Sequence, residues 1–411
     1  MRRTLPYLLI AVLLLVAAYV LACPFAAPVQ AQSPTTQPLL GKESLVYEGA
    51  FRLPAGFDGG GKPMAWNPWN STLYIGGQGQ QAIAEVNIPA IRNATSLTTL
   101  ETATIRTPFR QPADIGLLQC SEAKLTGGVL PWLGNLIVSG YCYFESGVET
   151  RSHWRVSGTT ATGPVQVGSL GAGFVSGAMT PIPAEWQPLF GGPALTGQCC
   201  IPIISRTSAG PAASVFDPAQ VGTTNPVPAV PVVGYPMGHW TLGTADSNNT
   251  PYNSTQYMGG LVFPPGTRSV LFFAGRKAMG QFCYGPGTDD QSLHMTPYPG
   301  APQSEKWCYD PVNHDKGTHG YPYAHFVYAY DANDLVAVKN GTKERWSLIP
   351  QTWTFDVPMQ YGQRVIDGVA YDPATKRIFL TAGNGDTYKP LVHVFKAVSY
   401  THLTLPTILL V

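Results

Sequence analysis

The sequence predicts an all-β fold, and three observations support this. Charged residues make up only 12% of the 411-residue chain, and its 44 glycines and 38 prolines supply many turns. A strand–turn–strand pattern recurs along the chain. No long stretch has the 3.6-residue apolar period of an amphipathic helix. Short strands joined by many loops account for this combination better than helices do.

Three segments carry the recurring pattern, and they superpose on Pro68, Pro265 and Pro373. They read AWNPWNSTLYIGG (65–77), LVFPPGTRSVLFFAG (261–275) and VAYDPATKRIFLTAG (369–383). In each, an apolar strand reaches a proline-initiated turn, and a β-rich strand follows the turn. A weaker copy, SVFDPAQ, spans 214–220, and residues 133–144 form a similar predicted strand without the proline. Each segment is therefore interpreted as a hairpin or part of one.

Copies of one hairpin unit spread over the whole chain predict a β-propeller. At about 40–50 residues per blade, we expect roughly six to eight blades, some with long insertions. The strand ESLVYEGAFRLP (43–54) is expected to pair with LVHVFKA (391–397) of the last blade, which would close the ring and hide its edges. One short helix is predicted in DANDLVAVKNG (331–341), where Asp331 or Asn333 caps the start and Gly341 ends it.

The YDPATKRIFLTAG type of repeat (371–383) resembles the blades of secreted bacterial β-propeller proteins of the NHL-like and YVTN-like kind. At the level of such motifs the resemblance covers about half of the chain. It implies the architecture and leaves the activity open, because propellers serve as lactonases, lyases, quinoproteins and binding modules.

Both ends of the chain are expected to lie outside this domain. Residues 1–31 have the layout of a secretory signal peptide, with two arginines, an apolar run and small residues before a cut after Ala31. Two alternatives remain, because VLAC ending at Cys23 resembles a lipoprotein lipobox and an uncleaved run is about long enough to span a bilayer. All three place the folded part outside the cytoplasm, as a secreted, periplasmic or cell-surface protein. Residues 398–411 begin with VSYTHLTLPT, which resembles a translated sequencing-library adapter, so a single propeller domain is expected over 32–397.

Six cysteines follow the predicted leader, and an even number in an oxidising compartment predicts disulfides. The local pairing joins Cys120 to Cys142, Cys283 to Cys308, and Cys199 to its neighbour Cys200. For the vicinal pair, the alternative is that both thiols pair elsewhere or stay free.

Charge and motifs exclude several classes of function. With a net charge of +1 and no basic run, the chain is not expected to bind nucleic acid. It contains no G-x-S-x-G elbow, Walker loop, H-E-x-x-H or C-x-x-C motif. Nothing in the sequence indicates an oligomer, and we expect a monomer.

The segment DPVNHDKGTHGYPYAH (310–325) concentrates three of the eight histidines of the chain. Its glycines and its proline at position 322 exclude a helix, so any shared site must be built by a folded loop. Such a loop could hold zinc or another divalent ion through the N and O ligands His314, Asp315, His319 and His325. The alternative is an ordered polar loop in which the same groups cap turns.

Further candidates are single polar residues in apolar or glycine-rich settings, namely Asp114, Arg206, His239 and Asp367. Arg206 follows a strand-like segment and must be paired or face a cavity, which suits either an ion pair or an anion. Aromatic residues in the long loops, chiefly Trp307, Tyr321 and Tyr323, suit a sugar, a peptide or another protein. For each of these residues, the alternative is an ordinary structural contact.

Two functions follow from these residues. The first is an extracytoplasmic propeller that binds a small molecule, a glycan or a protein through its loop face. The second is a metal-assisted hydrolase or lyase on the same scaffold, with the histidine loop holding the ion. Binding ranks first because the sequence offers no recognisable pair of general base and nucleophile.

Overall fold

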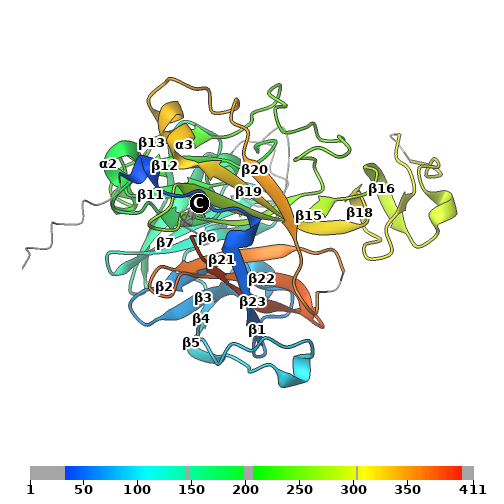
Figure 1. Cartoon of the computed structure of the whole chain (residues 1–411), viewed down its shortest axis with the longest axis horizontal. Coiled ribbons are helices and arrows are strands. Elements are labelled where there is room, and N and C mark those ends of the chain that lie inside the picture. Colours follow the sequence, from blue (N-terminus) through cyan, green and yellow to red (C-terminus); the bar gives the residue numbers. More distant parts are fainter. Residues whose placement is uncertain (1–32, 144–148, 199–206, 302–303, 361, 400–411) are drawn as a thin grey trace, which may run out of the picture.

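The computed structural model describes residues 33–143, 149–198, 207–301, 304–360 and 362–399 (Figure 1). In these residues the chain forms five four-stranded antiparallel sheets and one three-stranded sheet. One strand of each four-stranded sheet lies innermost, and these strands are β2 (Met64–Asn67), β6 (Lys124–Trp132), β10 (Met179–Pro181), β14 (Tyr257–Val262) and β21 (Ile366–Asp372). They contact one another in the closed order β2, β6, β10, β14, β21. The protein is therefore a β-propeller, and we call these sheets blades 1 to 5 in chain order.

The outer strands follow in the order of the chain. Blade 1 adds β3 (Thr72–Gly76), β4 (Ile83–Asn87) and β5 (Thr104–Arg110); blade 2 adds β7 (Asn135–Cys142), β8 (Arg151–Ser157) and β9 (Thr160–Gln166). Blade 3 adds β11 (Ala194–Gly197), β12 (Ala213–Phe216) and β13 (Ala229–Val233); blade 4 adds β15 (Ser269–Ala278), β19 (Tyr323–Asp331) and β20 (Gln351–Phe355). Blade 5 adds β22 (Arg377–Asp386), β23 (Lys389–Ala397) and, at its outer edge, β1 (Leu45–Arg52).

The pairing of β1 with β23 confirms the predicted closure of the ring. The two strands run antiparallel from Leu45 opposite Ala397 to Arg52 opposite Leu391. The hairpins predicted at Pro68, Pro265 and Pro373 are also confirmed, since each joins the first two strands of a blade, in blades 1, 4 and 5. The weaker copy at 214–220 joins later strands of its blade, because β12 leads there through a 3-10 turn into β13, which pairs antiparallel with β12.

The described residues form five blades, where the length of the chain predicts roughly six to eight. Long connections account for the difference. The three-stranded sheet of β16 (Cys283–Thr288), β17 (Cys308–Tyr309) and β18 (Lys316–His319) is inserted between β15 and β19 of blade 4. It projects to one side of the ring in Figure 1, and we call residues 279–322 the insertion.

Helices are few and short. The described residues contain two α-helices, α2 (Gln187–Phe190) and α3 (Ala332–Lys339). The predicted helix is confirmed in α3, where the Asp331 carboxylate caps the first turn by accepting from the amide of Asn333. Eight single-turn 3-10 helices connect strands, at Pro34–Thr36, Lys42–Ser44, Gln78–Gln80, Leu97–Thr99, Ile115–Leu117, Ala172–Phe174, Pro218–Gln220 and Gln291–Leu293. Within the described ranges, no helix is both long and apolar enough to cross a bilayer.

Two of the predicted disulfides, Cys120–Cys142 and Cys283–Cys308, are confirmed. The first ties the approach to β6 to the end of β7, and the second ties β16 to β17 inside the insertion. Cys199 and Cys200 lie outside the described residues, so their predicted bond stays a prediction.

The apolar core is divided among the five interfaces between neighbouring blades. In β22, Ile378 and Leu380 pack toward blade 4, whereas Phe379 between them packs toward blade 1. All three side chains are at most 1% exposed. A strand buried on both faces needs a continuous apolar run rather than an alternating one, which explains the sequence RIFLTAG.

Near the axis the blades approach so closely that glycine is required. A Cβ on Gly128 would lie 2.0 Å from the carbonyl oxygen of Gly177 in the next blade. A Cβ on Gly368 would lie 2.5 Å from the carbonyl oxygen of Gly61. Both are backbone contacts that cannot rotate away, so a larger side chain must push two blades apart.

We expect Gly128→Ala to lower the free energy of unfolding by about 2 kcal/mol, because the added methyl group overpacks this contact. Urea denaturation followed by circular dichroism measures the change. Gly171→Ala is the matched control, since a Cβ there meets nothing within 4 Å. Equal stability of the two variants would contradict the proposed packing.

Candidate functional site at the two ends of the central channel

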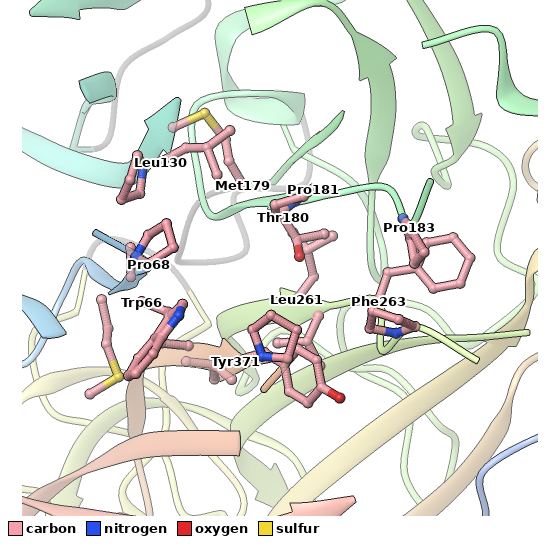
Figure 2. Close-up of a pocket in the computed structure, with 18 residues that line it drawn as sticks. Trp66, Pro68, Leu130, Met179, Thr180, Pro181, Pro183, Leu261, Phe263 and Tyr371 are labelled. Atoms are coloured by element: carbon pink, nitrogen blue, oxygen red, sulfur yellow. The ribbon is translucent and has the colours of Figure 1, made fainter. Parts of the chain in front are cut away.

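The innermost strands surround a channel whose two ends differ in chemistry. At one end, where the first hairpin of each blade turns, all five strands contribute to an apolar pocket of about 170 Å³ (Figure 2). We call it the cup, and its lining is Met64, Ala65, Trp66, Pro68, Leu130, Pro131, Met179, Thr180, Pro181, Pro183, Leu261, Val262, Phe263, Pro265, Val369, Ala370, Tyr371 and Pro373.

The cup has a buried floor and an exposed rim. Met64, Met179 and Leu261 are at most 8% exposed, whereas the prolines of the three repeated hairpins are exposed. In Figure 2 the side chains of Met179 and Leu130 approach the same space as those of Trp66 and Tyr371. The Trp66 ring is itself held in place, because it lies parallel to Phe379 with ring centroids 6.1 Å apart.

Few polar groups face the cup. Thr180 supplies a hydroxyl group, and the Tyr371 side chain supplies another. Burial raises the pKa of Tyr371 to about 12, so this residue is a neutral phenol at ordinary pH. An apolar wall with two neutral hydroxyls suits an apolar ligand better than an ion.

The other end of the channel carries charge. In β21 the register skips Asp367, which is a bulge residue between Ile366 and Gly368. At the approach to β2, Gly61 donates to the carbonyl of Gly76, and Gly76 donates to the carbonyl of Pro63, so Lys62 is skipped in the same way. A β-bulge aims a side chain out of the regular alternation.

Lys62 and Asp367 lie close enough for each to influence the pKa of the other. Burial lowers the pKa of Lys62, and the Asp367 carboxylate only partly opposes this. Burial raises the pKa of Asp367 to about 6, although Lys62 favours its ionised form. Both directions mean that these charges are poorly solvated, which is a property typical of functional sites.

Further polar groups reach this end from blades 2 and 4. Burial raises the pKa of Tyr141, and the charges of Tyr143, Tyr257 and Asp367 raise it further. These residues therefore converge from three blades, and Arg276 donates to the Tyr257 hydroxyl at 2.8 Å. We call this group the collar, and it consists of Lys62, Tyr141, Tyr143, Tyr257, Arg276 and Asp367.

The insertion is anchored to the collar through Arg276. The guanidinium donates to the carbonyl of Thr318 at 2.9 Å and lies over the ring of Tyr323, 5.2 Å from its centroid. The Tyr323 hydroxyl donates to the buried Asp310 carboxylate at 2.6 Å, and His319 Nδ1 lies 2.7 Å from the same oxygen. This chain of contacts connects a collar cation to the base of the insertion.

The structure places the residues of the predicted metal site in separate surroundings. The ring nitrogens of His319 face Asp310 and two backbone carbonyls, and exposed His314 lies 3.1 Å from Asp289. Asp315 is exposed. His325 is buried in β19 against Phe355, with ring centroids 5.2 Å apart. In the part of the chain that the structure describes, no three His, Cys, Asp or Glu residues are grouped so that they could hold a metal ion.

The predicted ligand residues that the structure describes make structural contacts with several different neighbours. Asp114 is exposed and caps a 3-10 turn by accepting from the amide of Gly116. His239 stacks on Trp346 at 4.1 Å, and Arg206 lies outside the described residues. Trp307 packs edge-on against Tyr298 within the insertion, while Tyr321 contacts both Tyr309 and Tyr323 at its base.

Both ends of the channel have a signal in the aligned repeats. Two positions before the repeated proline, the residue is aromatic in all three copies, as Trp66, Phe263 and Tyr371, and these three line the cup. Six positions before the proline stand Lys62, Gly259 and Asp367, which are the bulge positions. The sequence prediction names Asp367 but misses Lys62 and the aromatic set, because it aligns the turns without comparing the strands that lead into them.

No protein-family model matches the chain, and no curated protein matches its sequence. Among solved structures, it is similar to a luciferin-regenerating enzyme, with 8% identity, 84% of this chain and 94% of that chain covered, and a TM-score of 0.38. It is also similar to an endo-arabinase from Bacteroides thetaiotaomicron (9% identity, 86% and 98% covered, TM-score 0.42). A third similar structure is the PQQ-bound aldose sugar dehydrogenase from Streptomyces coelicolor (11% identity, 87% and 99% covered, TM-score 0.37).

We expect Asp367→Asn to stabilise the protein at pH 7.5 and to leave it unchanged below about pH 4. The pKa of Asp367 is about 6 in the folded protein and about 4 in the unfolded chain. Between pH 4 and pH 6, folding is therefore accompanied by the uptake of a proton at Asp367. The free energy of unfolding therefore falls as the pH rises from about 4 to 6, and asparagine removes that loss, which is about 3 kcal/mol for a difference of about two pKa units.

Urea denaturation at pH 4 and pH 7.5 measures this difference. Asp58→Asn serves as the control, because Asp58 is exposed. A variant at position 367 that is no more stable than the unmodified protein at pH 7.5 would show that this carboxylate is well solvated.

Proposed function

We propose that this protein is an extracytoplasmic β-propeller that binds an apolar, ring-bearing small molecule in the cup. The observation that carries the proposal is the convergence of all five innermost strands on one apolar pocket. The two disulfides support a location in an oxidising compartment, where such bonds persist.

The size of the cup sets the size of the ligand. A dry apolar cavity of about 150 Å³ is known to bind benzene, so a pocket of about 170 Å³ suits one or two fused rings. The walls supply flat faces at Trp66 and Phe263 and flexible contacts at Met64 and Met179. Thioether side chains adapt their shape to a bound ring and make favourable contacts with it.

Affinity comes mainly from apolar surface removed from water, at about 25 cal/mol per Å². Specificity comes from shape and from the hydroxyl groups of Thr180 and Tyr371, either of which can pair with a polar substituent at the edge of the ligand. The scaffold needs no large movement to bind such a molecule, because the innermost strands that form the walls are fixed by their hydrogen-bonded neighbours.

The described residues do not favour a metal-assisted hydrolase or lyase. The described residues provide no set of three ligands, and the histidines proposed for it lie in separate surroundings. The proposal therefore concerns binding, and it assigns no reaction to the cup.

We expect indole to bind the folded protein saturably and Trp66→Ala to weaken this binding at least tenfold, which is about 1.4 kcal/mol. Isothermal titration calorimetry with indole measures the affinity. Trp69→Ala is the matched control, because Trp69 is three residues away, 49% exposed and outside the cup.

A second variant, Thr180→Leu, fills the cup without removing a wall, so it should also weaken binding. If indole does not bind, or if it binds both variants as it binds the unmodified protein, the cup is only packed structure and the proposed function is wrong.

A further inference from the structure

Two charges of the collar, those of Lys62 and Asp367, stand at unusual positions in the channel. Lys62 and Asp367 occupy equivalent positions in blades 1 and 5, which are neighbours in the ring. The corresponding bulge residues of blades 2 and 4 are Gly127 and Gly259. The two charges thus lie on neighbouring channel strands. At the equivalent positions, blades 2 and 4 have glycine and so add no side chain.

Neither charge has a hydrogen-bond partner among the described residues. The Lys62 side chain is 6% exposed, yet among the described residues its ammonium group has no hydrogen bond and no ion pair within 4 Å. Asp367 likewise has no hydrogen-bond partner in the described part of the chain. Buried charges in proteins are normally paired, because each lone one loses its hydration without compensation. Lys62 is such a charge, and Asp367 on the neighbouring channel strand likewise has no hydrogen-bond partner among the described residues.

Arg276 is a second buried cation at this end of the channel. Arg276 is 3% exposed and adopts a left-handed backbone conformation at φ 53° in the bulge of β15. Its terminal nitrogens are held by Tyr257 and Thr318, whereas its Nε has no partner among the described residues. The net charge of the collar is therefore +1 when Lys62, Arg276 and Asp367 are all ionised, and an anion is favoured over a cation.

We propose that the collar is a second ligand site, separate from the cup, which binds a small hydroxycarboxylate. The carboxylate of the ligand pairs with the Lys62 ammonium group, in the positive field of Arg276. A hydroxyl group of the ligand donates to the Asp367 carboxylate. The phenol of Tyr141 flanks the site and offers a neutral hydrogen-bonding group to a further hydroxyl.

Each residue in this scheme has a separate task. Lys62 distinguishes an anion from a neutral sugar, and Asp367 distinguishes a hydroxylated anion from a plain one. A site that hydrogen-bonds a substrate hydroxyl discriminates strongly against analogues that lack it, because its own polar group is then left unpaired. The proposal thus predicts an order of affinity in which gluconate and lactate exceed acetate, and glucose is last.

The test is calorimetric titration of the folded, disulfide-bonded protein at pH 7 with gluconate, lactate, acetate and glucose. We expect saturable binding of gluconate or lactate, binding at least tenfold weaker for Lys62→Met, and no change for the matched control Lys396→Met, whose lysine is exposed. Lys62→Met should fold, because it replaces a buried ammonium group with an apolar side chain of similar length. Asp367→Asn should reduce the preference for lactate over acetate while leaving acetate binding in place.

Three outcomes would overturn the proposal. They are no saturable binding of either hydroxycarboxylate, equal affinity of the Lys62→Met variant, and equal affinity for gluconate and glucose. A titration repeated in the presence of saturating indole separates the two sites. Unchanged gluconate binding under that condition is expected if the collar and the cup are distinct, whereas mutual exclusion would reduce them to one site.

Discussion

The close approach of five strands around one axis is the constraint on which the rest of the structure depends. Each blade must bring its first strand within backbone contact of its neighbours, and glycines such as Gly128 and Gly368 make this approach feasible. The apolar core is then a set of interfaces between blades rather than one central mass, as the opposite directions of Leu380 and Phe379 show. The side chains that the axis can still accommodate are few, and they gather where the strands begin and end.

This arrangement explains why the two ends of the channel differ. Where the strands end in hairpin turns, the prolines and the aromatic residues before them supply apolar surface. Where the strands begin, bulges break the regular alternation and place Lys62 and Asp367 beside the axis. The insertion contacts this charged end through Arg276 and Tyr323. The scaffold thus has an apolar surface at one end of the channel and a polar surface at the other, and residues at one end can be substituted without altering the other.

Patterns local in the sequence predicted the fold well. The repeated prolines predicted three of the first hairpins, the capped segment predicted α3, and the cysteine spacing predicted two disulfides. Blade number was harder, because the insertion adds length without adding a blade. The candidate site was hardest. His314 and His319 are close in the sequence but face different partners, whereas Lys62 and Asp367 are about 300 residues apart and meet only because the ring closes. Proximity of that kind is set by register and topology, which composition does not reveal.

The closing strand has a consequence for how the molecule is made. Ribosomes deliver β1 first and β23 last, so the edge strand of blade 5 must wait for nearly the whole chain before its partner exists. Until then the ring is an open arc, with the unpaired backbone of β1 exposed and the interface between blades 1 and 5 unformed. Contacts of such long sequence separation form slowly. Lys62 and Asp367 lie on either side of this same seam, so these two charges come together only when blades 1 and 5 join.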